Sequence, residues 1–220
     1  LFDRSCRPPR LTPIGRIIAK QSQSVIAQTQ ILQDLTRPSD TLTGHFSLGF
    51  IQSSGVRILP EFILRANIDA SRASFQYVSG LSEHLTDLVA NSQLDAAVVT
   101  QVDGLSEDLH YDVIALEELA LVVPQTHADV PIDELPERLT FIHFMPSTGI
   151  GKLIAKRQRT LKRKPTNVLV LDSIESAVEC TKLGLGYTIL PLPDVKRYRD
   201  ETVFIDHPGP SRIDRSLSLV

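Results

Sequence analysis

Short apolar segments alternate with longer segments of helical periodicity along most of this chain, and this alternation limits the folds open to it. The first part is predicted to form strands at 45–52, 74–79 and 94–101, separated by helices at 56–67 and 81–92. Strands that are apolar throughout and separated by helices are typical of parallel sheets with helices on both faces. The pattern therefore predicts an α/β fold.

A second α/β unit follows the first. Its predicted elements are strands at 118–124, 139–144, 167–171 and 187–190 and helices at 148–163 and 173–183. At roughly 100 to 200 residues per domain, a chain of 220 residues holds one large domain or two small ones. We predict two small α/β lobes, the first at 43–116 and the second at 117–220, with a return strand from the second toward the first.

A long amphipathic segment precedes the lobes. Thr12 and Pro13 are a typical helix start, because Thr caps free N–H groups and Pro is tolerated at the first helical position. We expect 12–42 to be a helix and linker, with its apolar side chains in one narrow stripe. Another surface must cover this stripe, either a helix of a second chain or the chain's own body. The stripe residues are Ile14, Ile18, Val25, Leu32 and Leu35.

Composition excludes several classes of protein. No run of about 18 apolar residues is present, so no membrane span is predicted. Cys6 and Cys180 are too few for a disulfide framework, and their number fits a reducing cytoplasm. The 23 basic and 26 acidic residues give a net charge of −3, which divides into +3 for 1–40 and −6 for the remainder. The acidic remainder lacks the basic footprint that nucleic-acid binding requires.

Catalytic and metal-binding motifs are not found. Gly-Ile-Gly-Lys at 149–152 lacks the P-loop spacing, and helix C-caps explain Gly184 and Gly186 better than a dinucleotide site does. The six histidines have no mutual metal spacing. Cys180 is expected to be a buried, small apolar residue, with oxidant sensing as the alternative. We predict no enzymatic activity, no cofactor and no metal.

Polar clusters stand where predicted strands end and helices begin. In open α/β sheets, ligands bind beyond the carboxyl ends of the strands, where helix N-termini present free N–H groups. Ser and Thr at these places are also ordinary helix caps. The hydroxyl and N–H donors suit a small organic anion. The candidate ligand residues in these clusters are Ser53, Ser54, Ser82, Thr100, Gln101, Ser147 and Thr148.

Charge is unevenly distributed in the second half of the chain. Seven basic residues and no acid lie in 152–164, whereas ten acids and no Lys or Arg lie in 103–137. Both runs are explained by solvated surfaces. The functional alternative is attraction between subunits, or of an anionic inducer toward the second lobe.

Four motifs in order along the chain resemble LysR-type transcriptional regulators. Leu-Phe-Asp-Arg and Leu-Thr-Pro-Ile-Gly in 1–15 resemble the end of the winged helix-turn-helix and the start of the linker helix. Leu-Thr-Gly and Leu-Gly in 42–49 resemble the entry into the effector domain. Gly-Leu-Ser and Leu-Asp-Ala-Ala in 80–97, and Gly-Leu-Gly-Tyr and Leu-Pro in 184–191, resemble later segments of that domain.

The resemblance implies a two-lobe fold of the periplasmic-binding-protein type II, with an inducer between the lobes. It implies a homodimer or homotetramer built through linker helices, and promoter DNA bound by an N-terminal domain of which 1–11 is a remnant. Ser53 matches a hydroxyl that contacts the inducer, and Ser82 matches a cap of the second helix. Thr100 and Gln101 fall at the cleft edge. The candidates on the second lobe are Pro146, Ser147 and Thr148.

We therefore expect the effector-sensing and oligomerisation portion of a cytoplasmic LysR-type regulator. Its lobes close on a small anionic metabolite and re-space the linker helices, which requires that the ligand bind one lobe arrangement better than another. The alternative from another class is a solute-binding protein of a transport system. Such a protein shares the two-lobe cleft but requires export.

Overall fold

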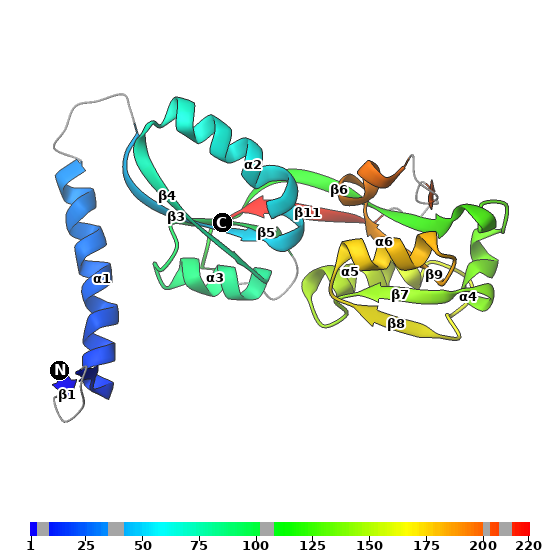
Figure 1. Cartoon of the computed structure of the whole chain (residues 1–220), viewed down its shortest axis with the longest axis horizontal. Coiled ribbons are helices and arrows are strands. Elements are labelled where there is room, and N and C mark those ends of the chain that lie inside the picture. The colour runs from blue at the N-terminus through cyan, green and yellow to red at the C-terminus, as the bar shows by residue number, and fades with distance from the viewer. Residues whose placement is uncertain (4–8, 35–41, 102–107, 200–202, 207–212) are drawn as a thin grey trace.

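The computed structural model describes residues 1–3, 9–34, 42–101, 108–199, 203–206 and 213–220. A long helix, α1, stands at one end of a body built of two lobes (Figure 1). One sheet runs through both lobes in the order β4-β3-β5-β11-β6-β9-β7-β8, and β10 pairs with β6 off this path. The strands of this sheet are β3 (Thr43–Ile51), β4 (Arg72–Gly80), β5 (Ala96–Gln101), β6 (Asp112–Pro124), β7 (Thr140–Phe144), β8 (Val168–Leu171), β9 (Gly186–Pro191), β10 (Val203–Asp206) and β11 (Asp214–Leu219).

Helices join and cover these strands, and a small hairpin precedes them. The hairpin consists of β1 (Phe2–Asp3) and β2 (Arg10–Leu11). The α-helices are α1 (Pro13–Asp34), α2 (Gln52–Asp69), α3 (Ser82–Ala90), α4 (Leu135–Arg138), α5 (Gly149–Gln158), α6 (Ile174–Lys182) and α7 (Leu192–Val195). Three short 3-10 turns are η1 (Gln125–His127), η2 (Ile132–Glu134) and η3 (Lys196–Tyr198).

The first lobe has the predicted parallel arrangement. Strand β3 lies between β4 and β5 and is parallel to both. Helices α2 and α3 lie on opposite sides of these strands (Figure 1). Its core includes Phe50, Leu85 and Val99, all buried, and burial of each such side chain contributes about 1.5–3 kcal/mol.

The predicted start of the first helix, at residue 56, was wrong. Helix α2 begins at Gln52, so Ser53 and Ser54 lie in its first turn rather than in a loop. The Ser54 hydroxyl donates to the Ile51 carbonyl at 3.1 Å, a bond that a serine can make without leaving the helical conformation. Pro60 consequently lies in the helix interior, where it lacks the N–H that would complete the backbone ladder.

The second lobe repeats the parallel arrangement around β7, which lies between β8 and β9. Its core includes Ile142, Ile154 and Tyr187, all fully buried. The helix predicted over 148–163 was too long at its end, because α5 ends at Gln158. There the Thr160 hydroxyl donates to the Arg157 carbonyl at 2.8 Å, and this bond replaces continuation of the helix.

Two antiparallel strands connect the lobes. Strand β6 pairs with β11 over Asp112–Glu118 and with β9 from Leu119 onward. Strand β11 also pairs with β5, so it ties the chain end to the first lobe. The predicted boundary between residues 116 and 117 falls within β6, close to the point where its partner changes. The sequence prediction had missed the first six residues of this strand.

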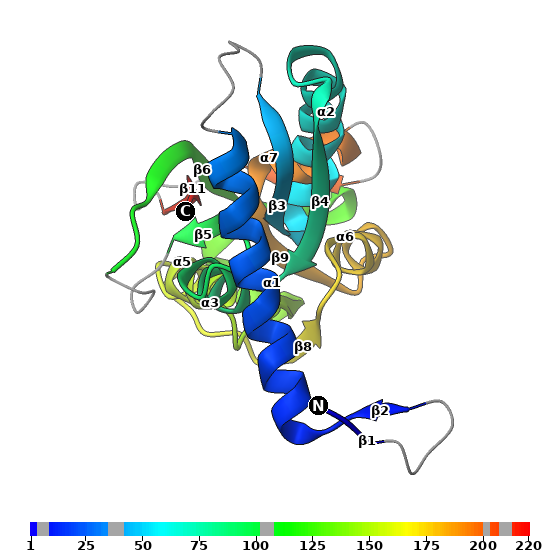
Figure 2. The same cartoon turned by 90° about the vertical axis from the view of Figure 1, so that its left-hand side faces the viewer.

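Helix α1 begins as predicted and extends away from the lobes. The Thr12 hydroxyl accepts the Gly15 N–H at 3.0 Å, and the hairpin lies at the helix end farthest from the body (Figures 1 and 2). Ile14, Ile18 and Val25 are 62%, 43% and 57% exposed. The chain's own body therefore does not cover these stripe residues. Leu35 and the side chain of Leu32 lie outside the described part of the chain, and a second chain as cover remains a prediction.

A matched pair of glycine substitutions tests the packing of helix α5. A Cβ on Gly151 would meet the Met145 carbonyl oxygen at 2.0 Å, whereas a Cβ on Gly55 in α2 would meet only the Phe50 Cβ at 3.8 Å. Gly151→Ala is expected to lower the free energy of unfolding by about 2–3 kcal/mol. Gly55→Ala should raise it by about 0.5–1 kcal/mol, because alanine has the better helix propensity. Urea denaturation measures both, and equal effects would contradict the packing described.

Candidate functional site

A cavity of about 250 Å³ opens between the lobes at the carboxyl ends of the parallel strands. The first lobe contributes residues from the ends of β3, β4 and β5 and the starts of α2 and α3. The second lobe contributes the end of β7 and the start of α5. The lining residues are Ile51, Gln52, Ser53, Ser79, Gly80, Leu81, Ser82, Glu83 and Thr100 from the first lobe and Phe144, Met145, Thr148, Gly149 and Ile150 from the second.

Three helix N-termini meet at this cavity. Neither α2 nor α3 has a side-chain cap, whereas Thr148 caps α5. The N-terminus of a helix carries about half a positive elementary charge and free N–H donors. Among the described residues that line the cavity, none is a lysine or an arginine. An anion here would therefore be held by N–H groups and hydroxyls rather than by a cationic side chain.

Four of the eight predicted ligand residues line the cavity, namely Ser53, Ser82, Thr100 and Thr148. The other four do not line it. Ser54 is fully buried and bonded to the Ile51 carbonyl, and Gln101 accepts the Ser218 hydroxyl at 3.0 Å. Pro146 and Ser147 belong to the adjoining turn between β7 and α5.

Sequence reasoning missed the apolar part of the lining. Phe144 ends β7, Met145 follows it, and Gly149 and Ile150 open α5. In a sequence, apolar residues at strand ends cannot be distinguished from core residues. Their position next to the predicted hydroxyl residues was the one signal that could have identified them as cavity lining. Met145 also has a φ of 44°, an unusual left-handed conformation for a non-glycine residue.

The hydroxyls of the cavity differ in what they already bind. The Ser82 hydroxyl oxygen accepts the Thr100 N–H at 3.1 Å. Thr148 accepts the Gly151 N–H at 3.3 Å and donates its proton to the Met145 carbonyl at 2.8 Å. Thr148 therefore acts as a helix cap whose proton is already donated.

A cluster of four charged side chains lies at the junction of the lobes; we call it the junction cluster. Its members are Arg57 of α2, Glu117 of β6, Asp194 of α7 and Arg215 of β11. Arg215 Nε donates to Glu117 at 2.8 Å, and Arg215 Nη2 donates to Asp194 at 3.1 Å. Arg57 Nε donates to Asp194 at 2.8 Å and its Nη2 donates to Glu117.

The junction cluster is buried except at Arg57. Arg215, Glu117 and Asp194 are 0%, 4% and 5% exposed, whereas the Arg57 side chain is 30% exposed. Burial raises the pKa of Asp194, and the charges of Arg215 and Arg57 oppose this rise. Two positive and two negative groups leave the cluster without net charge.

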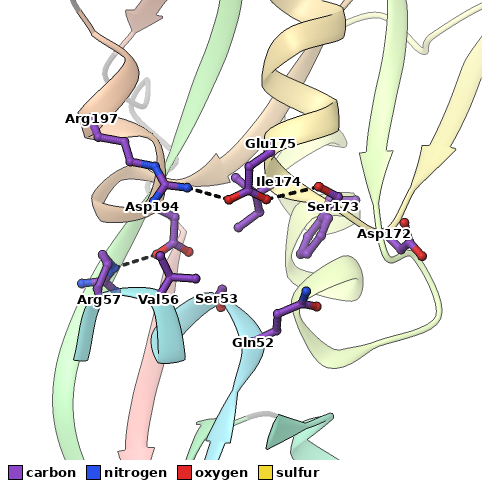
Figure 3. A pocket seen from close by; sticks show the side chains of 11 residues that line it. Gln52, Ser53, Val56, Arg57, Asp172, Ser173, Ile174, Glu175, Asp194 and Arg197 are labelled. Atoms are coloured by element: carbon purple, nitrogen blue, oxygen red, sulfur yellow. Dashed lines mark hydrogen bonds and ion pairs between the residues drawn. The ribbon is translucent and has the colours of Figure 1, made fainter. Parts of the chain in front are cut away.

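A smaller cavity of about 50 Å³ lies beside the first, between α2, α6 and α7 (Figure 3). It shares Gln52, Ser53 and Phe144 with the larger cavity. Its charged walls are paired with one another, Arg197 with Glu175 at 2.6 Å and Arg57 with Asp194 (Figure 3). This space suits a few water molecules rather than a metabolite.

Ser53 connects these features. It lines both cavities, and its hydroxyl oxygen accepts a hydrogen bond from Arg215 Nη1 at 2.8 Å. The residue that the sequence placed at the ligand site thus also contacts the junction cluster.

Part of the basic run at 152–164 pairs with the acidic run. Lys162 binds Asp133 at 2.8 Å, and Arg163 pairs with Glu137. These pairs are exposed and lie within one chain, so they contribute little to stability. Attraction between subunits through the rest of the run remains a prediction.

The remaining predictions concern the glycines after α6, Cys180, metal sites and membrane spans. Gly184 has a φ of 77° and directly follows Leu183, the C-cap of α6, as predicted. The same prediction was wrong for Gly186, which is the first residue of β9. Cys180 is half-buried against the second-lobe core rather than fully buried. In the described ranges, no group of three or more His, Cys, Asp or Glu could hold a metal ion. No helix among the described residues has the length and apolar character needed to cross a membrane.

Comparison with known proteins places the chain among transcriptional regulators. Residues 39–220 match the LysR substrate binding domain family. The HTH-type transcriptional regulator SoxR of Arthrobacter sp. is 23% identical over 219 residues, covering 100% of this chain and 74% of SoxR. Other curated relatives are covered over 65% and 66% of their length, so the chain spans about two thirds to three quarters of these proteins.

Solved structures share the fold. A full-length OxyR variant from Pseudomonas aeruginosa superposes with a TM-score of 0.72 at 21% identity, over 99% of this chain and 72% of that one. The effector binding domain of QuiR in complex with shikimate gives a TM-score of 0.67 at 19% identity, over 81% of this chain and 87% of that one. The fold is therefore of the predicted periplasmic-binding-protein type II, with two α/β lobes.

Substitutions of two glutamates test the junction cluster. Glu117→Gln would leave the buried guanidinium group of Arg215 and the partly exposed one of Arg57 short of one counter-charge, and we expect it to lower the free energy of unfolding by about 3–5 kcal/mol. Glu175→Gln removes an exposed partner of Arg197 and should cost less than about 1 kcal/mol. Chemical denaturation of both variants measures the difference. Equal losses would show that burial of the cluster is misassigned.

Proposed function

Because the chain belongs to the LysR substrate binding domain family, and so carries the effector-binding domain of a LysR-type transcriptional regulator, we propose that it senses a small carboxylic acid. The effector binds in the cavity between the lobes. The relatives are named transcriptional regulators rather than transport proteins, so the alternative of a transporter's solute-binding protein is not retained. The proposal assigns no chemical step to this chain.

The observation that carries this proposal is the convergence of three helix N-termini on a cavity without lysine or arginine in its described lining. A hydrogen bond to a charged group contributes about 1.5–3 kcal/mol, and a helix N-terminus adds about 0.3–1 kcal/mol for an anion. These terms favour a singly charged carboxylate. A doubly charged phosphate would have no cationic side chain to neutralise it.

The other lining residues indicate which groups the effector carries besides its carboxylate. Ile51, Phe144, Met145 and Ile150 give part of the cavity an apolar wall, and Ser79 and Thr100 add polar groups. A cavity of about 250 Å³ suits a compact organic acid. Shikimate in the QuiR domain is such an acid in the same fold, which supports the class of effector without identifying it.

Signal transmission follows from the position of the cavity. The effector contacts α2 and α3 on one lobe and α5 on the other, so a closed arrangement of the lobes offers it more donors than an open one. Differential binding of this kind shifts the population of lobe arrangements. We propose that the shift passes to α1, whose exposed stripe pairs with a second copy in a homodimer or homotetramer. The movement of α1 then changes how the regulator binds promoter DNA in the cytoplasm.

A thermal-shift screen tests the proposed effector class. A ligand that binds only the folded protein at 100 times its Kd stabilises it by about 2.7 kcal/mol. Shikimate, benzoate and small aliphatic carboxylic acids should include stabilising ligands, whereas their methyl esters and primary amides should stabilise much less. Stabilisation by neutral compounds alone would overturn the proposal.

Substitution of Ser79 tests whether charge at the cavity decides binding. Ser79 is exposed at the end of β4 and lines the cavity. Ser79→Asp adds a carboxylate beside the helix N-termini, and it should weaken binding of the acid found in the screen by about tenfold or more. Ser79→Asn has nearly the same shape without the charge and should bind nearly as wild type. Calorimetry measures both affinities, and an equal loss in the two variants would contradict an anionic effector.

A further inference from the structure

We propose that Arg215 positions the Ser53 hydroxyl as a hydrogen-bond donor and thereby makes the first-lobe wall of the cavity prefer a carboxylate to a neutral amide. Arg215 itself does not line the cavity. This inference rests on the proposed function, because it names a positioning residue and a selection rule for the same site.

The direction of the hydrogen bond between these residues is fixed by chemistry. A guanidinium group has only donors, so the Ser53 oxygen must accept from Arg215 Nη1 at 2.8 Å. The proton of Ser53 then has to point elsewhere. Within the described residues, no hydrogen bond takes up this proton, and Ser53 is half-buried at the cavity wall. The proton is therefore available to a ligand.

The Ser82 hydroxyl is also oriented as a hydrogen-bond donor toward the cavity, but by a different partner. Its oxygen accepts the Thr100 N–H at 3.1 Å, which leaves its proton for the cavity. Thr148, on the opposite lobe, has already donated its proton to the Met145 carbonyl. The two serines therefore act as hydroxyl donors on the first-lobe wall, and the uncapped starts of α2 and α3 add N–H donors there.

These donors discriminate between ligands by pairing, and the exposed side chain of Glu83 lines the same wall. A carboxylate offers only acceptors and pairs with every one of these donors. A primary amide presents an NH₂ group on one side, and a donor facing a donor leaves both unpaired. Sites that hydrogen-bond one particular group reject an analogue that cannot complete the bonds.

The junction cluster holds Arg215 in place for this role. Arg215 is fully buried, and it binds Glu117 from β6 and Asp194 from α7. Its charge also polarises the Ser53 hydroxyl, which strengthens that hydroxyl as a donor. Arg57 binds the same two carboxylates, but its hydrogen bonds do not include Ser53. Arg57 is thus a matched control within the same cluster.

The test uses acetate and acetamide as probes. Acetamide has an NH₂ group in the place of one carboxylate oxygen of acetate. Binding is followed by two-dimensional NMR titration of the backbone amides of Gln52, Ser53, Ser82 and Thr100. In the wild-type chain, acetate should bind at least about tenfold more tightly than acetamide. Arg57→Lys should keep this preference. Arg215→Lys should lose most of it, because lysine keeps the positive charge but lacks the planar guanidinium group with its several N–H donors.

A double substitution separates positioning from general loss of structure. Ser53→Ala alone should remove the preference as Arg215→Lys does, and the double variant should show no further loss. Additive effects, or equal effects of Arg215→Lys and Arg57→Lys, would overturn the inference. Absence of a saturable acetate response in the wild-type chain would overturn it as well.

A second comparison applies if Arg215→Lys does not fold, which the NMR spectrum itself reveals. Ser53→Ala should lose the acetate preference, whereas Arg57→Lys should keep it, and equal losses would overturn the assignment of Ser53 as a donor. If acids stabilise the chain in the thermal screen while acetate and acetamide bind alike, this inference fails and the proposed function stands. If no acid binds, the proposed function fails.

Discussion

The junction cluster is the interaction on which the arrangement of the two lobes depends. It brings together one helix of each lobe and both connecting strands, through Arg57, Asp194, Glu117 and Arg215. Removing such charges from water costs several kcal/mol per ion, and their pairing offsets this cost only while all partners are present. The cluster therefore contributes less to net stability than to specificity. It favours lobe arrangements that keep all four groups paired.

The cavity proposed for the effector and the lobe junction are in direct contact through Ser53. Ser53 lies at the start of α2, between the cavity and Arg215. Any lobe movement that shifts Asp194 relative to Glu117 has to re-orient Arg215, and with it the oxygen of Ser53. An effector that binds Ser53 as we propose would therefore be coupled to lobe position through hydrogen bonds as well as through the shape of the cleft. Linkage requires this coupling to act equally in both directions.

The sequence predicted most of the elements because periodicity and end signals are local. Thr12 and Pro13 start α1, and the buried runs of β3, β5 and β9 are short and apolar. The first half of β6 was missed even though Val113, Ile114 and Leu116 belong to an apolar run, and the structure leaves all three exposed. The start of α2 was misplaced because Ser53 and Ser54 are typical of loops.

The candidate site was half predictable for a similar reason. Serines and threonines near strand ends can be recognised in the sequence, and four of those predicted as ligand residues line the cavity. Their roles depend on partners that are distant in the sequence: Arg215 lies 162 positions from Ser53. No local pattern identifies Arg57, Glu117, Asp194 and Arg215 as one group. Only the folded chain shows that Thr148 has already donated its proton.

The arginines of the junction cluster do not line the cavity, and this increases the dependence of ligand affinity on lobe closure. If an arginine lined the cavity, it would attract an anion in every lobe arrangement, and equal affinity for two states shifts neither. Here both arginines of the junction cluster are paired with carboxylates, and the cavity lining offers short-range donors beside the exposed carboxylate of Glu83. Hydrogen bonds lose strength steeply with distance and angle, so donors from α2, α3 and α5 act together only when the lobes are close. Short-range donors thus give the ligand a larger difference in affinity between open and closed lobes than a fixed cation would.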